Sequence, residues 1–364
     1  MEPIWKCRYC GFESDLWSKY YWCCPRCSKP LDIIYKRKFE PETRVRGLRR
    51  YSSLLPFVPE KSLGEGNTPL INYRDGGREI LFKLEYLNPS GSFKDRGSSL
   101  AIYYGFKMGY RGIVEDTSGN TGLSVTLYSS FYGLKSIIYM PRNAPLGKKV
   151  LIKALGGEIV EASSRYEASR IVLENIRDRF YVAHTWSYFY ILGASTIAYE
   201  VYEEYGVPDL VIAPVGSGGL FLGLIRGFKN LYDLGVTRKI PRFIAVQGVS
   251  VHPLFKRMKG YSLEGDSSLA DGIMVSNPPR LEEIYEELVS VKGDVVLVDN
   301  KDIINAMKDL YERGFIVEPT SATVWAGYKK IRRENLGESV LMPLTGSGLK
   351  TIDLIEKYLM AHGP

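Results

Sequence analysis

The stretch Asn88-Pro89-Ser90-Gly91-Ser92-Phe93-Lys94-Asp95-Arg96-Gly97 decides the fold that we expect for this chain. It follows an apolar, strand-like run at residues 80–84 and precedes a helix-like run at residues 98–104. A strand, a turn rich in Gly, Pro and Ser, and a helix start form a common frame for a reactive group in an α/β protein. Lys94 stands among small and polar residues rather than in a charge run, so it is a candidate Schiff-base lysine. The alternative is a surface lysine that caps a helix.

Beyond this stretch, the chain alternates between strand-like and helix-like segments. Strands are expected at residues 112–116, 137–141, 158–160 and 180–182, and helices at residues 123–132, 148–155 and 165–179 lie between them. A second series has strands at residues 210–215, 243–249 and 340–344 and helices at residues 194–205 and 220–231. Such β-α-β alternation predicts parallel sheets flanked by helices. We expect a larger domain at residues 46–99 and 190–364, with a smaller domain at residues 100–189 inserted into it.

Three further motifs lie where an expected strand meets a helix or a turn. Ser118-Gly119-Asn120-Thr121-Gly122 offers backbone amides, hydroxyl groups and the Asn120 amide, which suit a carboxylate and a phenolate oxygen. Gly216-Ser217-Gly218-Gly219 exposes backbone amides at a helix start, which suits a phosphate group. Thr345 lies in a turn after the strand at residues 340–344. Each motif could instead be an ordinary helix cap or loop exit.

Residues 1–45 contain two cysteine pairs, Cys7-x2-Cys10 and Cys24-x2-Cys27. Four thiolates at this spacing can surround one zinc ion tetrahedrally, and they leave no open coordination position for catalysis. Two disulfides and a redox CxxC pair are the alternatives, and Cys23 could exchange roles with Cys24. We predict that this segment is a small ribbon with a structural zinc ion.

The ten residues around Lys94 resemble the lysine motif of the fold-type II pyridoxal-phosphate (PLP) enzymes, and among these they look most like the threonine synthase family. The Asn120 motif, the Gly216–Gly219 motif and the turn at Thr345 resemble the same family in the same order, within a likeness that covers residues 64–350. A small ribbon of this sort precedes the catalytic part in many archaeal threonine synthases. The resemblance implies an α/β fold with two doubly wound parallel-sheet domains and the N-terminal zinc ribbon.

The resemblance also implies roles for single residues. Lys94 would hold PLP and act as the catalytic base, and the other cofactor-binding positions would be Phe93, Asn120 at the 3′-oxygen, Gly216, Ser217, Gly218 and Gly219 at the phosphate, and Thr345 at the pyridine nitrogen. The substrate-binding positions would be Ser90, Ser118, Gly119, Thr121, Arg142, Lys148 and Tyr190. The ribbon would hold Zn²⁺ through Cys7, Cys10, Cys24 and Cys27. A neutral threonine at the ring nitrogen makes PLP a milder electron sink, which suits elimination and replacement chemistry.

The activity implied is the conversion of O-phospho-L-homoserine and water to L-threonine and phosphate. The chain departs from the family's phrase Asn-Pro-Tyr-Arg-x-Glu-Gly, because Tyr190 and Leu192 stand where Arg and Glu are usual, ahead of a helix expected to start at Ala194. The phrase at residues 270–273 resembles threonine dehydratases instead. The alternatives are therefore a sulfide-using cysteine or homocysteine synthase acting on O-phosphoserine or O-phosphohomoserine, a threonine or serine dehydratase, and a zinc-ribbon regulator with a silent PLP-like domain.

Composition and charge narrow the class of protein. The chain has 364 residues, of which 45% are hydrophobic and 24% charged, as is ordinary for a globular protein. No apolar run reaches the roughly 18–20 residues that span a membrane, and the first residues lack the apolar core of a signal peptide, so we expect a cytoplasmic protein. An anionic small substrate explains the net charge of +7 as well as nucleic acid does, and we expect a phosphorylated amino acid as the partner rather than nucleic acid. Family members are commonly dimers, so we expect a homodimer.

Overall fold

The computed structural model describes residues 2–360, and the chain folds into two compact units. The first unit comprises Met1–Asn67 and Lys94–Ala194, and the second comprises Thr68–Phe93 and Ser195–Pro364. The chain therefore leaves the first unit after Asn67, returns to it at Lys94 and leaves it again within helix α5 (Tyr188–Glu204). This grouping places residues 46–67 in the first unit. The domain boundaries expected from the sequence placed them in the larger domain, and those boundaries stay a prediction.

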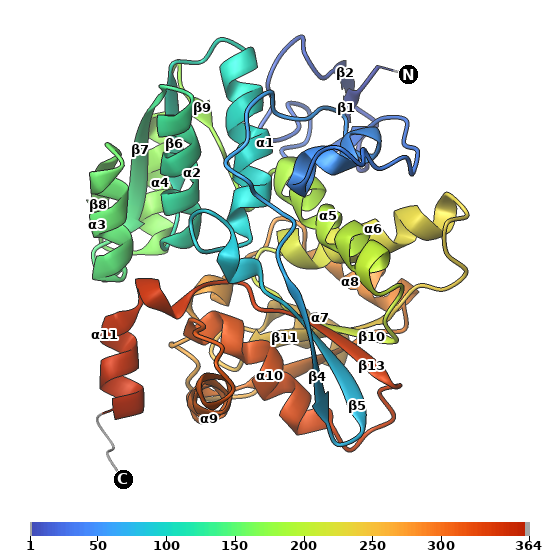
Figure 1. Ribbon diagram of the computed structural model, residues 1–364. Helices are drawn as coiled ribbons and strands as arrows, with labels where there is room; N and C mark the ends of the chain where they lie inside the picture. Colours follow the sequence, from blue (N-terminus) through green and yellow to red (C-terminus); the bar gives the residue numbers. More distant parts are fainter. Residues whose placement is uncertain (1, 361–364) are drawn as a thin grey trace. The chain divides into compact units, whose positions relative to one another are not determined.

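The first unit begins with a three-stranded antiparallel sheet in the order β2-β1-β3, drawn in blue in Figure 1. Its strands are short: β1 (Ile4–Lys6), β2 (Glu13–Asp15) and β3 (Asp32–Ile34). A 3-10 helix, η1 (Gly47–Leu54), follows this sheet in the chain. Gly47 has a φ of +65°, and a Cβ there would lie 2.3 Å from the Glu65 carbonyl oxygen, so this crossing requires glycine.

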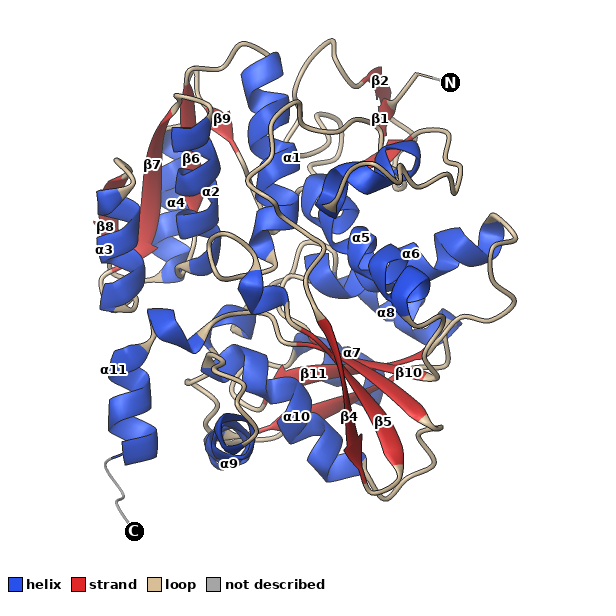
Figure 2. Cartoon of the chain, viewed as in Figure 1, coloured by secondary structure: helices blue, strands red, loops and turns tan. Residues whose placement is uncertain are grey.

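The rest of the first unit is built on a four-stranded parallel sheet in the order β8-β7-β6-β9 (Figure 2). Its strands are β6 (Gly112–Asp116), β7 (Lys135–Pro141), β8 (Glu158–Ala162) and β9 (Phe180–Tyr181). Its helices are α1 (Lys94–Lys107), α2 (Asn120–Phe131), α3 (Leu146–Ala154) and α4 (Arg165–Glu174), followed by the start of α5. Because all four strands are parallel, the loops after β6, β7 and β9 leave the sheet at the same edge, which is where α/β proteins bind ligands.

The second unit is built on a six-stranded sheet in the order β12-β11-β10-β13-β5-β4. All neighbouring strands are parallel except β4 and β5, which form an antiparallel hairpin at the edge. Gly76 and Gly77, with φ of +56° and +85°, make the hairpin turn, which needs positive φ at both positions. This antiparallel edge strand adds to the parallel sheet that the sequence predicts. The strands are β4 (Leu70–Asp75), β5 (Arg78–Lys83), β10 (Leu210–Pro214), β11 (Arg242–Gly248), β12 (Asp294–Val298) and β13 (Ser339–Pro343).

Helices and short turns complete the second unit. They are η2 (Glu85–Leu87), α6 (Gly219–Asp233), α7 (Pro253–Lys259), η3 (Asp271–Ile273), α8 (Leu281–Ser290), α9 (Asn300–Glu312), α10 (Pro319–Ile331), η4 (Gly348–Lys350), α11 (Ile352–Ile355) and η5 (Glu356–Met360). Strands β10 and β13 are buried along their whole length, as parallel strands are when both faces of the sheet are covered. The core of this unit gathers around Trp325 of α10, whose ring centroid lies 5.7 Å from that of Phe82 on β5.

Three of the helices that carry predicted site residues begin several residues earlier in the chain than the sequence indicates. Helix α1 begins at Lys94, α2 begins at Asn120, and α5 begins at Tyr188. The expectation that a helix starts at Ala194 is therefore wrong, because Tyr188–Gly193 already form its first turns. Lys94, Asn120 and Tyr190 thus all stand in the first turn of a helix, where backbone N–H groups have no partner within the helix.

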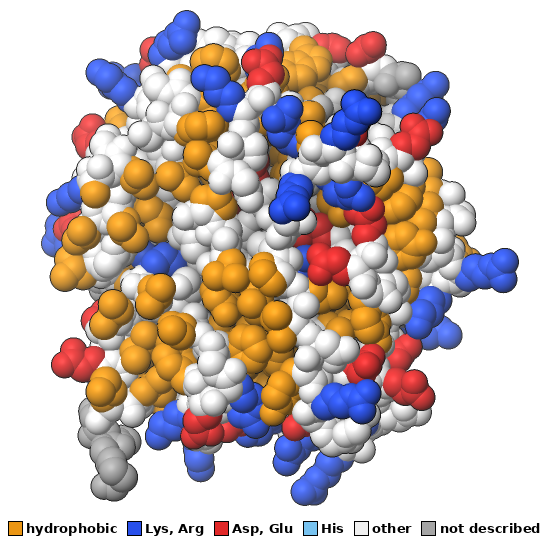
Figure 3. Space-filling model, in the orientation of Figure 1, with side chains coloured by type: hydrophobic (Ala, Val, Ile, Leu, Met, Phe, Trp, Pro, Cys, Tyr) orange, Lys and Arg blue, Asp and Glu red, His pale blue; other side chains and the backbone are white. Residues whose placement is uncertain are grey.

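The surface carries charges of both signs. On the face shown in Figure 3, Lys and Arg side chains are interspersed with Asp and Glu side chains. This mixing accompanies a formal net charge of only +7. Separately, none of the helices within residues 2–360 combines the length and the apolar character needed to cross a bilayer.

Candidate active site

The loop that leads to the lysine is fastened to the loop that follows β13. The Phe93 backbone N–H donates to the Thr345 carbonyl at 3.1 Å. The Gly91 carbonyl accepts from the Ser347 backbone N–H at 2.9 Å and from the Lys350 ammonium at 2.7 Å. These contacts, all inside the second unit, fix the backbone of residues 91–93 and place Thr345 beside Phe93.

Thr345 presents a hydroxyl group that has no hydrogen-bond partner within residues 2–360. The residue is only 2% exposed, so water does not replace the missing partner. Leaving a buried hydroxyl unsatisfied costs about 1–3 kcal/mol, and such a group in a folded protein calls for an explanation. A heteroaromatic ring nitrogen would satisfy this hydroxyl, so Thr345 fits the role that the resemblance to PLP enzymes implies.

The loop between β10 and α6 is shaped by glycine. Gly218, just before α6, has a φ of +92°, and a Cβ there would lie 2.3 Å from Ile284 Cδ1. At Gly216, a Cβ would lie 3.0 Å from the Ile273 Cα atom. The α6 helix has 15 residues, and the N–H groups of its first turn point out of its N-terminus. A small-residue loop at the start of such a helix suits a phosphate group.

In the first unit, the side chain of Lys148 packs against the Asn120 motif. Gly119 has a φ of +151°, and a Cβ there would lie 2.4 Å from Lys148 Cδ, on helix α3. Lys148 is only 1% exposed, so its stem is buried against the backbone at the start of α2. Arg142, the other cationic candidate from this region, is exposed. The geometry therefore brings Lys148 to the motif.

The aromatic ring of Tyr190, which we call the Tyr190 wall, lies beside Lys94. The Lys94 Nζ atom lies 5.5 Å from the centroid of the Tyr190 ring. The Tyr190 hydroxyl lies 2.8 Å from the Ser98 hydroxyl, and both side chains are buried. Burial, and then the charge of nearby Glu115, raise the pKa of the Tyr190 phenol well above its usual range. Tyr190 therefore offers a neutral hydroxyl group to the site, where an arginine would offer a cation.

Gly97 lets the Tyr190 wall approach helix α1. A Cβ at Gly97 would lie 2.5 Å from Tyr190 Cδ1 and 2.7 Å from the Tyr190 Cα atom, which cannot move without moving α5. We expect Gly97→Ala to destabilise the protein by about 1–3 kcal/mol, although alanine is the better helix former. The matched control is Gly105→Ala on the same helix, where the new Cβ would meet only the Phe180 ring, at 3.0 Å. Urea unfolding measures both, and a Gly97→Ala protein at least as stable as wild type would contradict the packing.

Two buried ionisable residues near Lys94 were missed by sequence reasoning. Glu115 on β6 is fully buried, and its Oε1 atom contacts Nδ1 of His184, which follows β9. Burial raises the pKa of Glu115 well above its usual range and lowers the pKa of His184 well below its usual range, and the charge of Lys94 lowers both. A carboxylate inside the apolar strand Gly112–Asp116 was the available signal, because charged residues are almost never fully buried unless paired.

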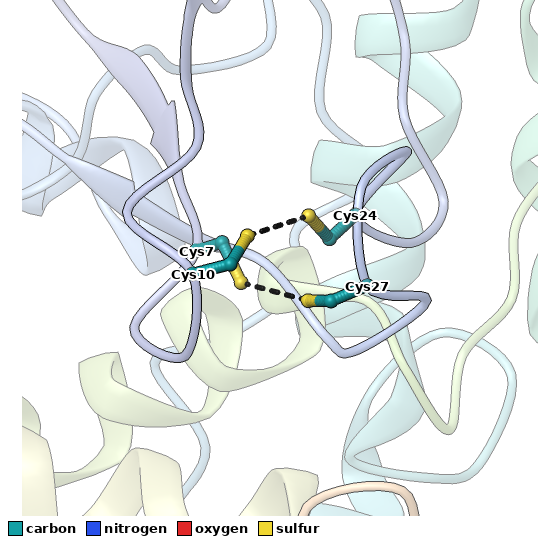
Figure 4. A group of neighbouring side chains, drawn as sticks. All are labelled: Cys7, Cys10, Cys24 and Cys27. Atoms are coloured by element: carbon teal, nitrogen blue, oxygen red, sulfur yellow. Dashed lines mark hydrogen bonds between the residues drawn. The ribbon is translucent and has the colours of Figure 1, made fainter.

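The ribbon brings four cysteines together (Figure 4). Cys7, Cys10, Cys24 and Cys27 point toward one another, and their Sγ atoms all lie within 4.8 Å. The closest pairs, Cys7 with Cys27 and Cys10 with Cys24, are 3.5 Å and 3.4 Å apart, and the cysteines are free. Four sulfurs at about 2.3 Å from a tetrahedral ion would be about 3.8 Å apart, so the set fits one metal ion. Cys23 is not part of this group.

An aromatic cluster connects the ribbon to the helices beside the lysine. The Trp5 ring centroid, on β1, lies 6.0 Å from that of Tyr104 on α1 and 5.7 Å from that of Phe189 on α5. The Tyr104 hydroxyl donates to the Leu16 carbonyl at 2.6 Å. The ribbon therefore packs on α1, which begins at Lys94, and on the turn of α5 that carries the Tyr190 wall.

The sequence-predicted site residues divide between the two units. The second unit holds Ser90, Phe93, Gly216, Ser217, Gly218, Gly219 and Thr345. The first unit holds Lys94, Ser118, Gly119, Asn120, Thr121, Arg142, Lys148, Tyr190 and the four ribbon cysteines. Their individual roles stay predictions.

A family profile described as pyridoxal-phosphate dependent enzyme matches residues 61–346. The chain belongs to this family. The match includes the lysine motif, the Asn120 motif and the glycine loop. It identifies PLP as the cofactor, and the α/β fold of this chain is the fold of these enzymes. The resemblance found in the sequence is thereby confirmed.

Individual proteins and solved structures are also similar to this chain. Threonine synthase of Methanocaldococcus jannaschii is 29% identical over 378 aligned positions, which cover 96% of this chain and 93% of that one. Threonine synthase of Bacillus sp. (strain ULM1) is 30% identical, covering 84% of this chain and 90% of that one. Among solved structures, maize serine racemase matches with a TM-score of 0.67 and 26% identity, covering 82% of this chain and 94% of that one.

Proposed function

We propose that this PLP-dependent enzyme is a threonine synthase, which converts O-phospho-L-homoserine and water to L-threonine and phosphate. The observation that carries the proposal is that curated threonine synthases match nearly the full chain; the Methanocaldococcus jannaschii enzyme matches 96% of it. The neutral hydroxyl of Thr345 agrees with this reaction type, because it can hydrogen-bond a pyridine nitrogen without holding a proton on it.

When bound, PLP supplies an electron sink that stabilises negative charge on the substrate carbons. The protein's own residues hold it and move the protons. Lys94 would hold the cofactor, and its amine, when free, would take the proton from the substrate α-carbon. The backbone N–H groups of Gly216–Gly219 bind the cofactor phosphate at the start of α6. Asn120 donates to the ring oxygen, and Phe93 places Lys94 through its hydrogen bond to Thr345.

The substrate side of the site lies on the Asn120 motif and the residues around it. Ser118, Gly119 and Thr121 bind the α-carboxylate with backbone N–H and hydroxyl groups at the start of α2, and Ser90 contributes a further hydroxyl. Lys148 is the cation for the substrate phosphate, because its buried stem crosses Gly119. Arg142 is exposed and could only assist electrostatically at the rim.

The ribbon and the assembly complete the proposal. One Zn²⁺ ion held by Cys7, Cys10, Cys24 and Cys27 stabilises the ribbon and takes no part in the reaction, since four thiolates leave no open position. The enzyme acts as a homodimer in the cytoplasm on a small phosphorylated amino acid.

Product analysis with O-phospho-L-homoserine tests the assignment. The PLP-loaded protein is expected to release threonine and phosphate in equal amounts in water alone, measured by amino-acid chromatography and a phosphate assay. Lys148→Ala should raise KM by more than it lowers kcat, because a phosphate contact present before and during reaction contributes uniform binding. Absence of threonine under conditions where the protein carries PLP would refute the assignment.

The Tyr190 wall favours a second candidate, a sulfide-using synthase. A neutral phenol beside Lys94 does not attract a phosphate dianion as an arginine would, so a substrate held by fewer cations fits this wall. The same assay with sulfide and either O-phosphoserine or O-phosphohomoserine distinguishes the two. Cysteine or homocysteine formed only with sulfide would favour this candidate, whereas ammonia released from threonine or serine would indicate a dehydratase.

A further inference from the structure

Two helices that start with predicted cofactor residues are joined by a hydrogen bond inside the first unit. Helix α1 begins at Lys94, α2 begins at Asn120, and the two helices lie side by side (Figure 1). The Ser124 hydroxyl, on α2, donates to the Oδ1 atom of Asp95, on α1, at 2.5 Å. Both side chains are 0% exposed, so water does not compete for this hydrogen bond. The contact therefore joins α1 one residue after Lys94 to α2 one turn after Asn120.

A second hydrogen bond holds α2 one turn further along the helix. The Tyr128 hydroxyl donates to the Glu65 carboxyl at 3.1 Å, and both residues are buried. The same Glu65 oxygen accepts from the Ser62 hydroxyl at 2.9 Å. Burial, and then the charges of Asp95 and Glu65, raise the pKa of the Tyr128 phenol well above its usual range, so the phenol keeps the proton that it donates. Helix α2 is thus held at two successive turns after its start.

The chemistry of the cofactor makes the distance between the two helix starts important. In PLP, the carbon that binds the lysine amine and the ring oxygen stand on neighbouring ring atoms, so the groups that bind them must stay close together. Lys94 and Asn120 are these groups in the proposed function, on which this inference rests. Asn120, Ser124 and Tyr128 are four positions apart, so they share one face of α2. Both hydrogen bonds therefore act on the face that begins at Asn120, whereas free helix ends fray easily.

We propose that the Asp95–Ser124 hydrogen bond sets the spacing of Lys94 and Asn120. Ser124 is then a positioning residue for cofactor attachment: it acts through Asp95 and exchanges no proton in the reaction. Without its hydroxyl, the buried Asp95 oxygen loses a donor that solvent does not replace. The first turns of both helices then gain freedom, and binding of PLP has to restore the order that the hydrogen bond otherwise supplies.

Ser124→Ala tests the spacing, and Ser129→Ala on the same helix is the matched control. Ser129 is also 0% exposed, but its hydroxyl has no hydrogen-bond partner within residues 2–360. The full-length protein is freed of PLP, PLP is added back, and absorbance records the rate of attachment and the Kd. We expect Ser124→Ala to slow attachment and to raise the Kd about tenfold each, whereas Ser129→Ala should stay within about twofold of wild type.

Urea unfolding separates positioning from plain stabilisation. A hydrogen bond that only stabilised the fold would lower the unfolding midpoint of Ser124→Ala and leave PLP attachment to the folded protein unchanged. An unchanged attachment rate and Kd in a folded Ser124→Ala protein would therefore overturn the proposal, whatever its unfolding midpoint.

Hydrogen exchange of the PLP-free protein needs neither cofactor nor substrate. Peptides that cover residues 94–101 and 120–127 should exchange about fivefold faster or more in Ser124→Ala than in wild type, because helix starts that are not joined open more often. The same peptides of Ser129→Ala should exchange as in wild type. Equal exchange in Ser124→Ala and Ser129→Ala would contradict the proposed spacing role.

A double-mutant cycle assigns the effect to this one hydrogen bond. Asp95→Ala removes the acceptor. If Ser124 acts through Asp95, adding Ser124→Ala to that variant should change its PLP Kd by less than about twofold, and a further tenfold loss would overturn the proposal. If Asp95→Ala does not fold, Ser124→Thr decides instead. It keeps a hydroxyl and should attach PLP at least about threefold faster than Ser124→Ala, and equal rates would overturn the proposal.

These measurements stand apart from the proposed function, because PLP attachment needs no substrate. A wild-type protein that binds PLP but forms no threonine from O-phospho-L-homoserine would refute the proposed function and leave the spacing role standing. Threonine formed normally by the wild-type protein, together with unchanged PLP attachment in Ser124→Ala, would overturn the spacing role alone.

Discussion

Replacing Lys94 by alanine is expected to lower the rate of threonine formation at least roughly 10³-fold, because one amine serves as both cofactor attachment and base. Lys94 is the first residue of α1, and its neighbour Phe93 is hydrogen-bonded to Thr345, so the rest of the site should stay in place. The protein should also lose its absorbance in the Schiff-base region. Borohydride reduction of the wild-type protein, followed by peptide mass spectrometry, should place the added cofactor mass on Lys94.

The other end of the same helix supplies the matched control. Lys107, the last residue of α1, is exposed and lies 3.0 Å from Glu60, and an exposed ion pair of this kind contributes about 0–1 kcal/mol. Lys107→Ala should therefore keep normal colour and turnover. Cofactor mass on any other lysine, or turnover within about tenfold of wild type in Lys94→Ala, would remove Lys94 from its role.

The features that could be predicted from the sequence are those set by neighbouring residues in the chain. Strand Gly112–Asp116 was found at its predicted bounds because a short apolar run between a glycine and a turn leaves little choice. The glycine loop at residues 216–219 could be predicted as a phosphate site because adjacent small residues at a helix start expose backbone N–H groups that suit a phosphate. The cysteine spacing predicted one cluster of four, although only the fold decides that Cys24, and not Cys23, belongs to it.

The features that could not be predicted depend on packing between distant segments. Residues 188–192 are mostly aromatic and have a low helix propensity, yet they form the first turns of α5. Phe189 is buried against Trp5 of the ribbon, and such tertiary contacts override local propensity. The Tyr190 wall reaches Lys94 only because Gly97 lets α5 approach α1. Likewise, nothing near Glu115 in the chain indicates that His184, on the loop after another strand, will hold its carboxyl group.

Replacing Cys24 by serine is expected to remove zinc from the protein and to destabilise the site as well as the ribbon. Loss of a structural metal belongs to the most destabilising class of changes, above about 4 kcal/mol. In a chain of this size, that corresponds to a fall in Tm of the order of 5–10 °C. Because Trp5 packs on Tyr104 of α1 and Phe189 of α5, the affinity for PLP should fall too. Metal analysis, calorimetry and a PLP titration measure the three effects.

Cys23, the neighbour of Cys24, supplies the matched control for this experiment. Cys23→Ser is the same substitution one position earlier, at a thiol outside the cluster, and it should keep one zinc per chain and a Tm within about 1–2 °C of wild type. If the Cys23 variant loses zinc and the Cys24 variant keeps it, the ligand set is wrong. If Cys24→Ser loses zinc but binds PLP as tightly as wild type, the ribbon stabilises only itself. The aromatic contacts predict the opposite, because a ribbon that unfolds uncovers α1 on the side where Tyr104 donates to Leu16.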